Sequence, residues 1–200
     1  MVMGNVRLWS LLMESFLVST GIVALAEMGD KTQLLSLVLA AKFRRPVPII
    51  LGILVATLLN HAGAGAIGAW ITTFLGENAL RWVLGLGFLA MAVWIMIPDK
   101  LDEDDAKIDA SHHSIFITTV IAFFLAEMGD KTQIATVALA AQYSSLLWVV
   151  AGTTLGMMIA NVPAVILGDK MAHKLPLNIV HGVAAVIFAI LGVVALLGVA

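Results

Sequence analysis

The sequence predicts an all-α integral membrane protein in which six transmembrane helices form two inverted three-helix repeats. Three observations support this fold class: an apolar composition, six long apolar segments and a motif that occurs twice. Hydrophobic residues make up 61% of the 200 residues and charged residues only 12%, whereas soluble domains carry about 25% charged residues. Together with a mean hydropathy of +1.04, this composition indicates that lipid surrounds most of the chain.

Each apolar segment is long enough to cross a hydrocarbon core, which requires about 20 residues. The segments lie at residues 11–41, 47–75, 80–97, 115–141, 146–168 and 177–199. Their continuous apolar character favours helices over barrel strands, in which apolar and polar residues alternate. We expect a first three-helix repeat at 1–97, an acidic cytoplasmic linker at 98–114 and a second three-helix repeat at 115–200. The linker matches no EF-hand spacing, so we expect a solvated connection.

The same nine residues, Leu-Ala-Glu-Met-Gly-Asp-Lys-Thr-Gln, occur at 25–33 and again at 125–133. Further matches, such as Gly52 with Gly152, indicate that the whole half is duplicated. Each half contains an odd number of predicted spans, so the second half is expected to lie upside down relative to the first. This is the inverted-repeat plan of many secondary transporters.

Basic residues predict the orientation. The loops after the first, third and fifth spans carry Lys42, Arg44, Arg45, Lys100, Lys107, Lys170 and Lys174, whereas the opposite side carries only Arg7 and Arg81. The positive-inside rule places the richer side in the cytoplasm, so both termini are expected to be extracytoplasmic. Ala24-Leu25-Ala26 resembles a signal-peptide cleavage site. The same pattern recurs mid-chain before Glu127, so we expect the N-terminal segment to be retained.

Each motif places two acids near the middle of an apolar segment, where ionisable groups are costly and usually functional. Glu27 and Asp30, like Glu127 and Asp130, are three residues apart and would share one face of a helix. Inverted symmetry would bring the two pairs together. Four carboxylates in a low dielectric cannot all stay ionised unless a cation or protons neutralise them. Oxygen ligands of this kind suit Ca²⁺, Mn²⁺ and Mg²⁺.

Neighbouring residues extend the predicted metal site. Gly29 and Gly129 weaken the helix, so an unwound turn there would offer carbonyl oxygens. Neutral oxygens come from Thr32, Gln33, Thr132 and Gln133. Met28 and Met128 are either thioether ligands that favour Mn²⁺ over Ca²⁺ or apolar filler. Asn60, His61 and Asn161 either complete the shell or bond between helices. Lys31 and Lys131 either pair with an acid or reach toward a membrane interface. The alternative to a metal site is a buried Asp–Lys network that fastens the helices to one another.

Composition excludes several classes of function. The net charge of -2 gives no sign of a nucleic-acid partner, and the absence of cysteine argues against thiolate sites for copper or zinc. No nucleophile–base arrangement is visible, so we expect neither an enzyme nor a resident cofactor. The expected partners are divalent metal ions, protons and the lipid bilayer.

The two copies of Glu-Met-Gly-Asp-Lys-Thr, beginning at Glu27 and Glu127, resemble the signature Glu-x-Gly-Asp-(Lys/Arg)-(Thr/Ser). That signature occurs twice in a family of small membrane cation transporters, which includes Golgi manganese/calcium transporters and bacterial manganese exporters. The resemblance covers essentially the whole chain. It implies that Glu27, Asp30, Glu127 and Asp130 bind the cation. It also implies that the transported ion is Mn²⁺ rather than Ca²⁺, and that the protein lies in a bacterial inner membrane.

The leading hypothesis is a secondary transporter that exports Mn²⁺ in exchange for protons. A Ca²⁺/H⁺ antiporter is the closest alternative. Two hypotheses come from other classes: a divalent cation channel that uses the acids as a charged ring, and a membrane scaffold that transports nothing. Saturable, proton-dependent flux would distinguish a carrier from a channel, and loss of metal handling after replacement of Glu27 would exclude a scaffold.

Overall fold

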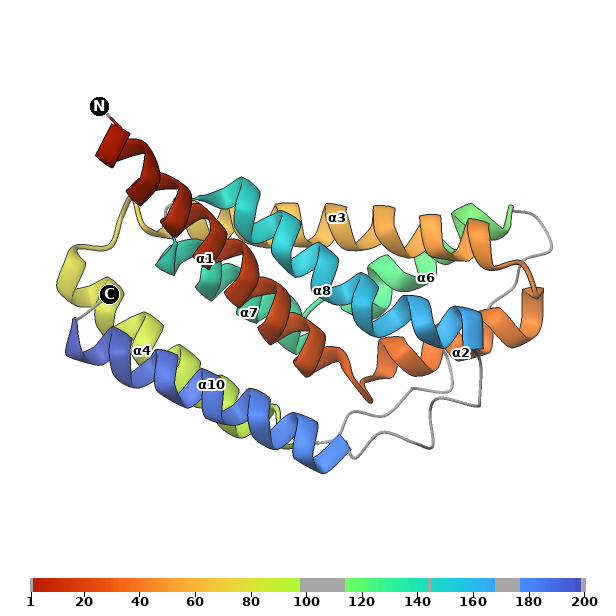
Figure 1. Ribbon diagram of the computed structural model, residues 1–200. Coiled ribbons are helices and arrows are strands. Elements are labelled where there is room, and N and C mark those ends of the chain that lie inside the picture. Colours follow the sequence, from red (N-terminus) through yellow and green to blue (C-terminus); the bar gives the residue numbers. More distant parts are fainter. Residues whose placement is uncertain (1, 98–113, 144, 168–176, 199–200) are drawn as a thin grey trace.

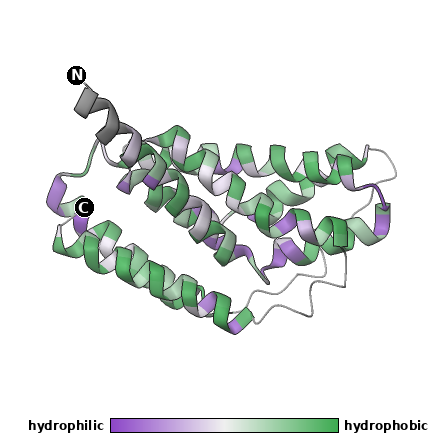
Figure 2. Cartoon of the chain, in the orientation of Figure 1, coloured by the Kyte–Doolittle hydropathy of each residue, from purple (hydrophilic) through white to green (hydrophobic). Residues whose placement is uncertain are grey.

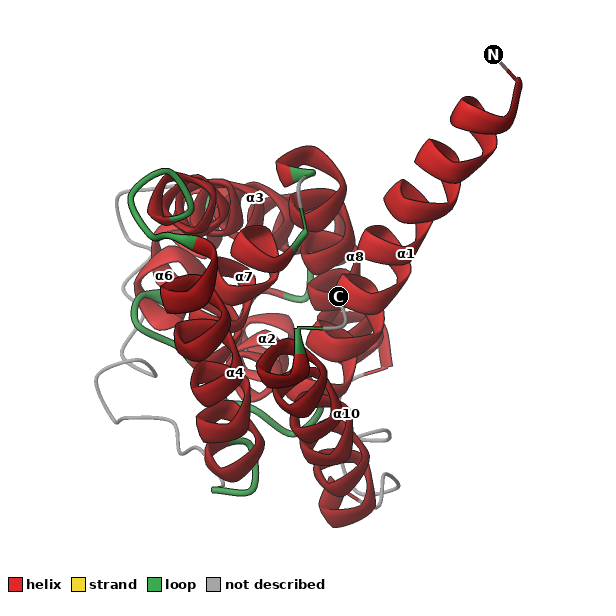
Figure 3. Cartoon of the chain, turned by 90° about the vertical axis from the view of Figure 1, so that its left-hand side faces the viewer, coloured by secondary structure: helices red, strands yellow, loops and turns green. Residues whose placement is uncertain are grey.

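The computed structural model of the protein describes residues 2–97, 114–143, 145–167 and 177–198, and the predicted linker lies almost entirely outside them. All regular structure in these residues is helical, which confirms the all-α class (Figure 3). The helices are α1 (Val2–Glu27), α2 (Lys31–Phe43), α3 (Pro46–Ile71), α4 (Glu77–Trp94), α6 (Ile115–Glu127), α7 (Lys131–Gln142), α8 (Leu146–Leu167) and α10 (Leu177–Leu197).

Four described helices are long and apolar enough to cross a membrane: α1 from Trp9, α3, α8 and α10. The shorter helix α6 is apolar as well. Large apolar side chains cover the outside, and Leu147, for example, is 81% exposed. Figure 2 shows the same apolar character along most of the helices. Such a surface requires lipid as its solvent, so the protein is a membrane protein.

Two of the predicted apolar segments are each divided into two helices by the repeated motif. Segment 11–41 contains α1 and α2, and segment 115–141 contains α6 and α7. In both, the helix stops after the glutamate and resumes after the aspartate. The glycines between them have positive φ values, 84° at Gly29 and 76° at Gly129. A residue with a Cβ adopts this conformation only with strain, so glycine permits the break.

The broken helices of each half pack against a long helix of the other half (Figure 1). Helix α3 lies along α6 and α7, and α8 lies along α1 and α2. The contact is close because small residues face the neighbouring backbone. A Cβ at Gly152 would lie 2.5 Å from the Phe16 carbonyl oxygen of α1, and one at Gly52 would lie 2.6 Å from Thr119 of α6. Small residues therefore let each long helix approach the broken helix of the other half closely.

Helices α4 and α10 form a separate pair beside this arrangement (Figure 1). Phe88 and Phe188 are fully buried between them, with ring centroids 6.2 Å apart. This apolar core continues to Leu139 of α7 and Ile22 of α1. The pair is thus attached to both broken helices and lies next to the two motifs.

Candidate metal centre

The two helix breaks have the same construction. Glu27 ends α1 and Asp30 precedes α2, just as Glu127 ends α6 and Asp130 precedes α7. In each break the aspartate N–H donates to the glutamate carbonyl oxygen at 3.1 Å. The expectation that each Glu–Asp pair shares a face of one continuous helix is therefore wrong. The glycine with positive φ turns the chain between them, so the two acids belong to different helices.

The glutamine of each motif stabilises its own turn. Gln33 Oε1 accepts a hydrogen bond from the N–H of Gly29 at 2.9 Å, and Gln133 Oε1 accepts one from Gly129 at 2.7 Å. The N–H of a turn residue inside a membrane needs such an acceptor, since no water is available in the hydrocarbon region. These two side chains, predicted as oxygen ligands, therefore hold the shape of the turn.

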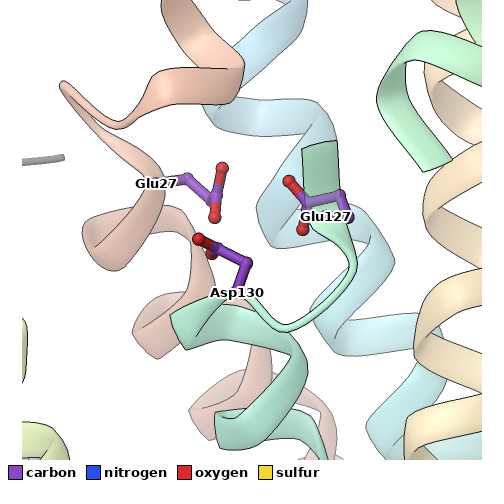
Figure 4. A group of neighbouring side chains, drawn as sticks. All are labelled: Glu27, Glu127 and Asp130. Atoms are coloured by element: carbon purple, nitrogen blue, oxygen red, sulfur yellow. The ribbon is translucent and has the colours of Figure 1, made fainter. Parts of the chain in front are cut away.

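Three carboxylates meet at the centre of the protein. One oxygen each from Glu27, Glu127 and Asp130 lies within 4.8 Å of the other two. Figure 4 shows the three side chains converging from the two motifs. Both glutamates are 0% exposed and Asp130 is 4% exposed. Asp30 is equally buried but is not one of the three, so the predicted group of four is three carboxylates in this structure.

The threonines leave one oxygen of each glutamate available. Thr32 Oγ1 donates to Glu27 Oε2, and Thr132 Oγ1 donates to Glu127 Oε2 at 3.1 Å. The other oxygens, Oε1 of Glu27 and of Glu127, are buried without a hydrogen-bond partner among the described residues. Because a buried, uncompensated carboxylate oxygen is costly, this donor set suits a hard divalent cation or protons.

The lysines pair across the two motifs. Lys31 Nζ lies 3.2 Å from Asp130 Oδ1, and Lys131 Nζ lies 3.8 Å from Asp30 Oδ1. Lys131 also donates to the carbonyl oxygen of Ile97 at 2.8 Å. Its side chain is only 4% exposed, whereas that of Lys31 is 21% exposed. The pairing with acids that the sequence left open is thus present, and each lysine neutralises an aspartate of the other half.

The polar residues of the long helices connect neighbouring helices. Asn60 of α3 donates to the Phe124 carbonyl oxygen at 3.1 Å and lies 3.4 Å from Gln133 Nε2. Asn161 of α8 accepts a hydrogen bond from Ser36 of α2 at 2.8 Å. Both asparagines therefore support the broken helices from the side. Ser36 was missed by the sequence reasoning, because a lone serine in an apolar segment carries no distinguishing signal.

The remaining predicted residues differ in exposure. His61 is fully buried in α3, and neither ring nitrogen has a hydrogen-bond partner among the described residues. Met28 is half-buried, whereas the side chain of Met128 is 58% exposed and lies at the surface, away from the buried carboxylates. His181 of α10 was not predicted to take part. Its Nε2 lies 2.6 Å from the Met28 carbonyl oxygen, a contact that no spacing in the sequence could reveal.

Comparison with known proteins identifies the family of the chain. The family model described as "Divalent cation/proton antiporter GDT1" matches residues 15–103 and 115–200. A Vibrio cholerae protein named "Putative manganese exporter" is 51% identical over 175 residues, which cover 87% of this chain and 86% of that protein. A GDT1-like protein of Synechocystis is 31% identical over 86% of this chain and 92% of its own length. No solved structure matches the chain. The chain therefore belongs to the GDT1 family of divalent cation/proton antiporters.

Proposed function

We propose that this protein exports Mn²⁺ across a bacterial inner membrane in exchange for protons. The observation that carries the proposal is the buried group of Glu27, Glu127 and Asp130, whose oxygens lie within 4.8 Å of one another. Oxygen atoms this close repel one another unless positive charge lies between them. A divalent cation supplies that charge, and the relative named as a manganese exporter supports Mn²⁺ as the ion.

Proton exchange follows from the same electrostatics. When the cation leaves, three buried carboxylates cannot all remain ionised, so protons replace it. When a cation returns, it displaces those protons. One site therefore holds either metal or protons, which is the requirement for antiport. Lys31, next to Asp130, offsets part of the negative charge and thereby weakens the attraction for the cation.

We infer that the duplicated architecture serves alternating access, in which the central cation site opens to one side of the membrane at a time. Each half contributes one broken helix and one long helix, and each long helix packs on the broken helix of the other half. The proposed six crossings form two inverted repeats, a plan that exposes a central site to each side in turn. The start of α1 and the end of α10 lie at the same end of the molecule, which supports placing both termini on one side of the membrane (Figure 1). The basic loops support the cytoplasm as the opposite side.

Transport by the purified protein in liposomes tests the proposal. A dye that Mn²⁺ quenches is trapped inside, and uptake is followed with and without a pH gradient for Mn²⁺, Ca²⁺ and Mg²⁺. We expect saturable Mn²⁺ uptake that the gradient drives and that a proton ionophore slows. Flux that rises linearly with concentration and ignores the gradient would indicate a channel. Absence of flux for all three ions would indicate a scaffold, and faster Ca²⁺ uptake would make Ca²⁺ the substrate.

A further inference from the structure

Helix α10 touches the first helix break directly. His181 Nε2 lies 2.6 Å from the carbonyl oxygen of Met28, which is the residue between Glu27 and the turn glycine. Leu177 lies over the same turn, since a Cβ added to Gly29 would be 2.7 Å from Leu177 Cδ1. The first turn of α10 thus holds this break by one hydrogen bond and one apolar contact.

No described residue covers the second break in this way, although its nine residues are identical. None of the described atoms lies within 4 Å of a Cβ added to Gly129, and Met128 is 58% exposed. In the repeat, Leu80 and Leu84 of α4 correspond to Leu177 and His181. These α4 residues instead line a pocket of about 460 Å³, which also contains the side chains of Glu77 and Arg81. The difference between the breaks therefore comes from α10 and not from the motif.

The contact acts on the position of a carboxylate. The Met28 carbonyl follows Glu27 immediately, and the next acid, Asp30, is bonded back to the Glu27 carbonyl oxygen at 3.1 Å. Gln33 holds the turn from within its own segment through Gly29. Lys31 and Gln33 fasten the start of α2 to Asp130 and to the Ala160 carbonyl oxygen of α8, whereas His181 bonds to the turn itself. A displaced turn would withdraw Glu27 from Glu127 and Asp130.

We infer that His181 is a positioning residue for transport, which holds the first motif so that Glu27 stays in the three-carboxylate group. The inference rests on the proposed function, because the positioned group is the proposed cation site. Its effect is specific to one motif. Among the described residues the second motif has no histidine contact of this kind, and its bond to the α4 side runs from Lys131 to the Ile97 carbonyl oxygen.

Substitutions at 181 test this role in the full chain. His181→Leu removes the hydrogen bond, whereas His181→Gln keeps an N–H donor. Asn178→Leu, at an exposed position in the same turn of α10, is the matched control. We expect His181→Leu to raise both the KM for Mn²⁺ uptake and the Kd for Mn²⁺ measured by calorimetry about fivefold. This factor corresponds to the free energy lost with one net hydrogen bond. His181→Gln should restore both to within about twofold, and the control should match the wild type.

The outcomes separate the possible failures. Wild-type values for His181→Leu would overturn the positioning role and leave the proposed function intact. An equal loss in Asn178→Leu would also overturn it, since the effect would then belong to the helix end. A loss in His181→Gln as large as in His181→Leu would show that the N–H donor is irrelevant. If His181→Leu does not fold, Leu177→Ala replaces it in the test. This variant removes the apolar contact of α10 with the same turn and should raise the KM for Mn²⁺ uptake. If the wild type moves no divalent cation, both proposals fail.

Discussion

The two motif glycines have the same backbone conformation in different surroundings, which makes them a controlled pair for substitution. Gly129→Ala introduces a Cβ at φ 76° into space that no described residue occupies. Gly29→Ala introduces one at φ 84°, and this Cβ would lie 2.7 and 2.8 Å from the Cδ atoms of Leu177. The first change adds backbone strain alone, and the second adds strain and crowding.

The magnitudes follow from these two terms. A left-handed conformation costs an alanine about 1–2 kcal/mol relative to glycine, so Gly129→Ala should lower the free energy of unfolding by about that amount. Crowding adds about 1 kcal/mol, the low end for overpacking, because the Cδ atoms of half-buried Leu177 are the ends of a flexible side chain. Gly29→Ala should therefore lower the free energy of unfolding by about 2–3 kcal/mol. Gly63→Ala is the control, since Gly63 is within α3, lacks a positive φ and has open space at its Cβ.

Unfolding of the purified variants in mixed micelles, titrated with a denaturing detergent and followed by circular dichroism, measures these differences. Mn²⁺ uptake in liposomes measures their effect on the site. We expect Gly63→Ala to be at least as stable as the wild type, since alanine favours a helix interior over glycine, and to transport Mn²⁺ normally. Gly129→Ala should be weakened and Gly29→Ala weakened most in both assays. A Gly129→Ala loss equal to or larger than that of Gly29→Ala would refute the role given to Leu177. Wild-type stability in both Gly29→Ala and Gly129→Ala would refute the claim that the turn requires glycine.

Three further predictions concern the cation and the orientation. Glu27→Gln and Glu127→Gln should each abolish transport while the protein stays folded, because the amide keeps the size but loses the charge; the exposed Glu77→Gln is the control. Near-normal manganese resistance in cells expressing either variant would exclude that glutamate as an essential ligand. Mn²⁺ binding should release protons and weaken as the pH falls from about 8 to 5. Calorimetry in buffers of different ionisation enthalpy would contradict this by showing neither effect. Single cysteines at positions 1 and 200 should be labelled from outside intact cells, and labelling at 105 would overturn the orientation.

The sequence was sufficient to predict the helical class, and it singled out the acids that the structure brings together, because charge and glycine in an apolar segment are strong local signals. It also predicted an unwound turn at Gly29 and Gly129, which the structure confirms. The shared helix face of Glu27 and Asp30 was wrong for the same reason: the weak helix that glycine implies ends there. A spacing rule for continuous helices does not apply across such a break.

Contacts between distant segments could not be predicted in this way. The pairing of Lys31 with Asp130 and of Lys131 with Asp30 depends on how the two broken helices face each other. The amide of Gln33 was expected at the cation, yet its oxygen bonds to the Gly29 N–H and its nitrogen to the Ala160 carbonyl oxygen. Residue type indicates that an oxygen is available, but the packing decides what it binds.

The crosswise lysine–aspartate pairs also have a consequence for synthesis of the chain. Residues 1–97 leave the ribosome first, and at that moment Asp30 lacks Lys131 and Lys31 lacks Asp130. Neither pair can form until residue 131 has been added, so the first half by itself lacks the contacts that join its broken helix to that of the second half. A chain terminated in the linker should be degraded by membrane proteases, and co-expression of the second half should protect it.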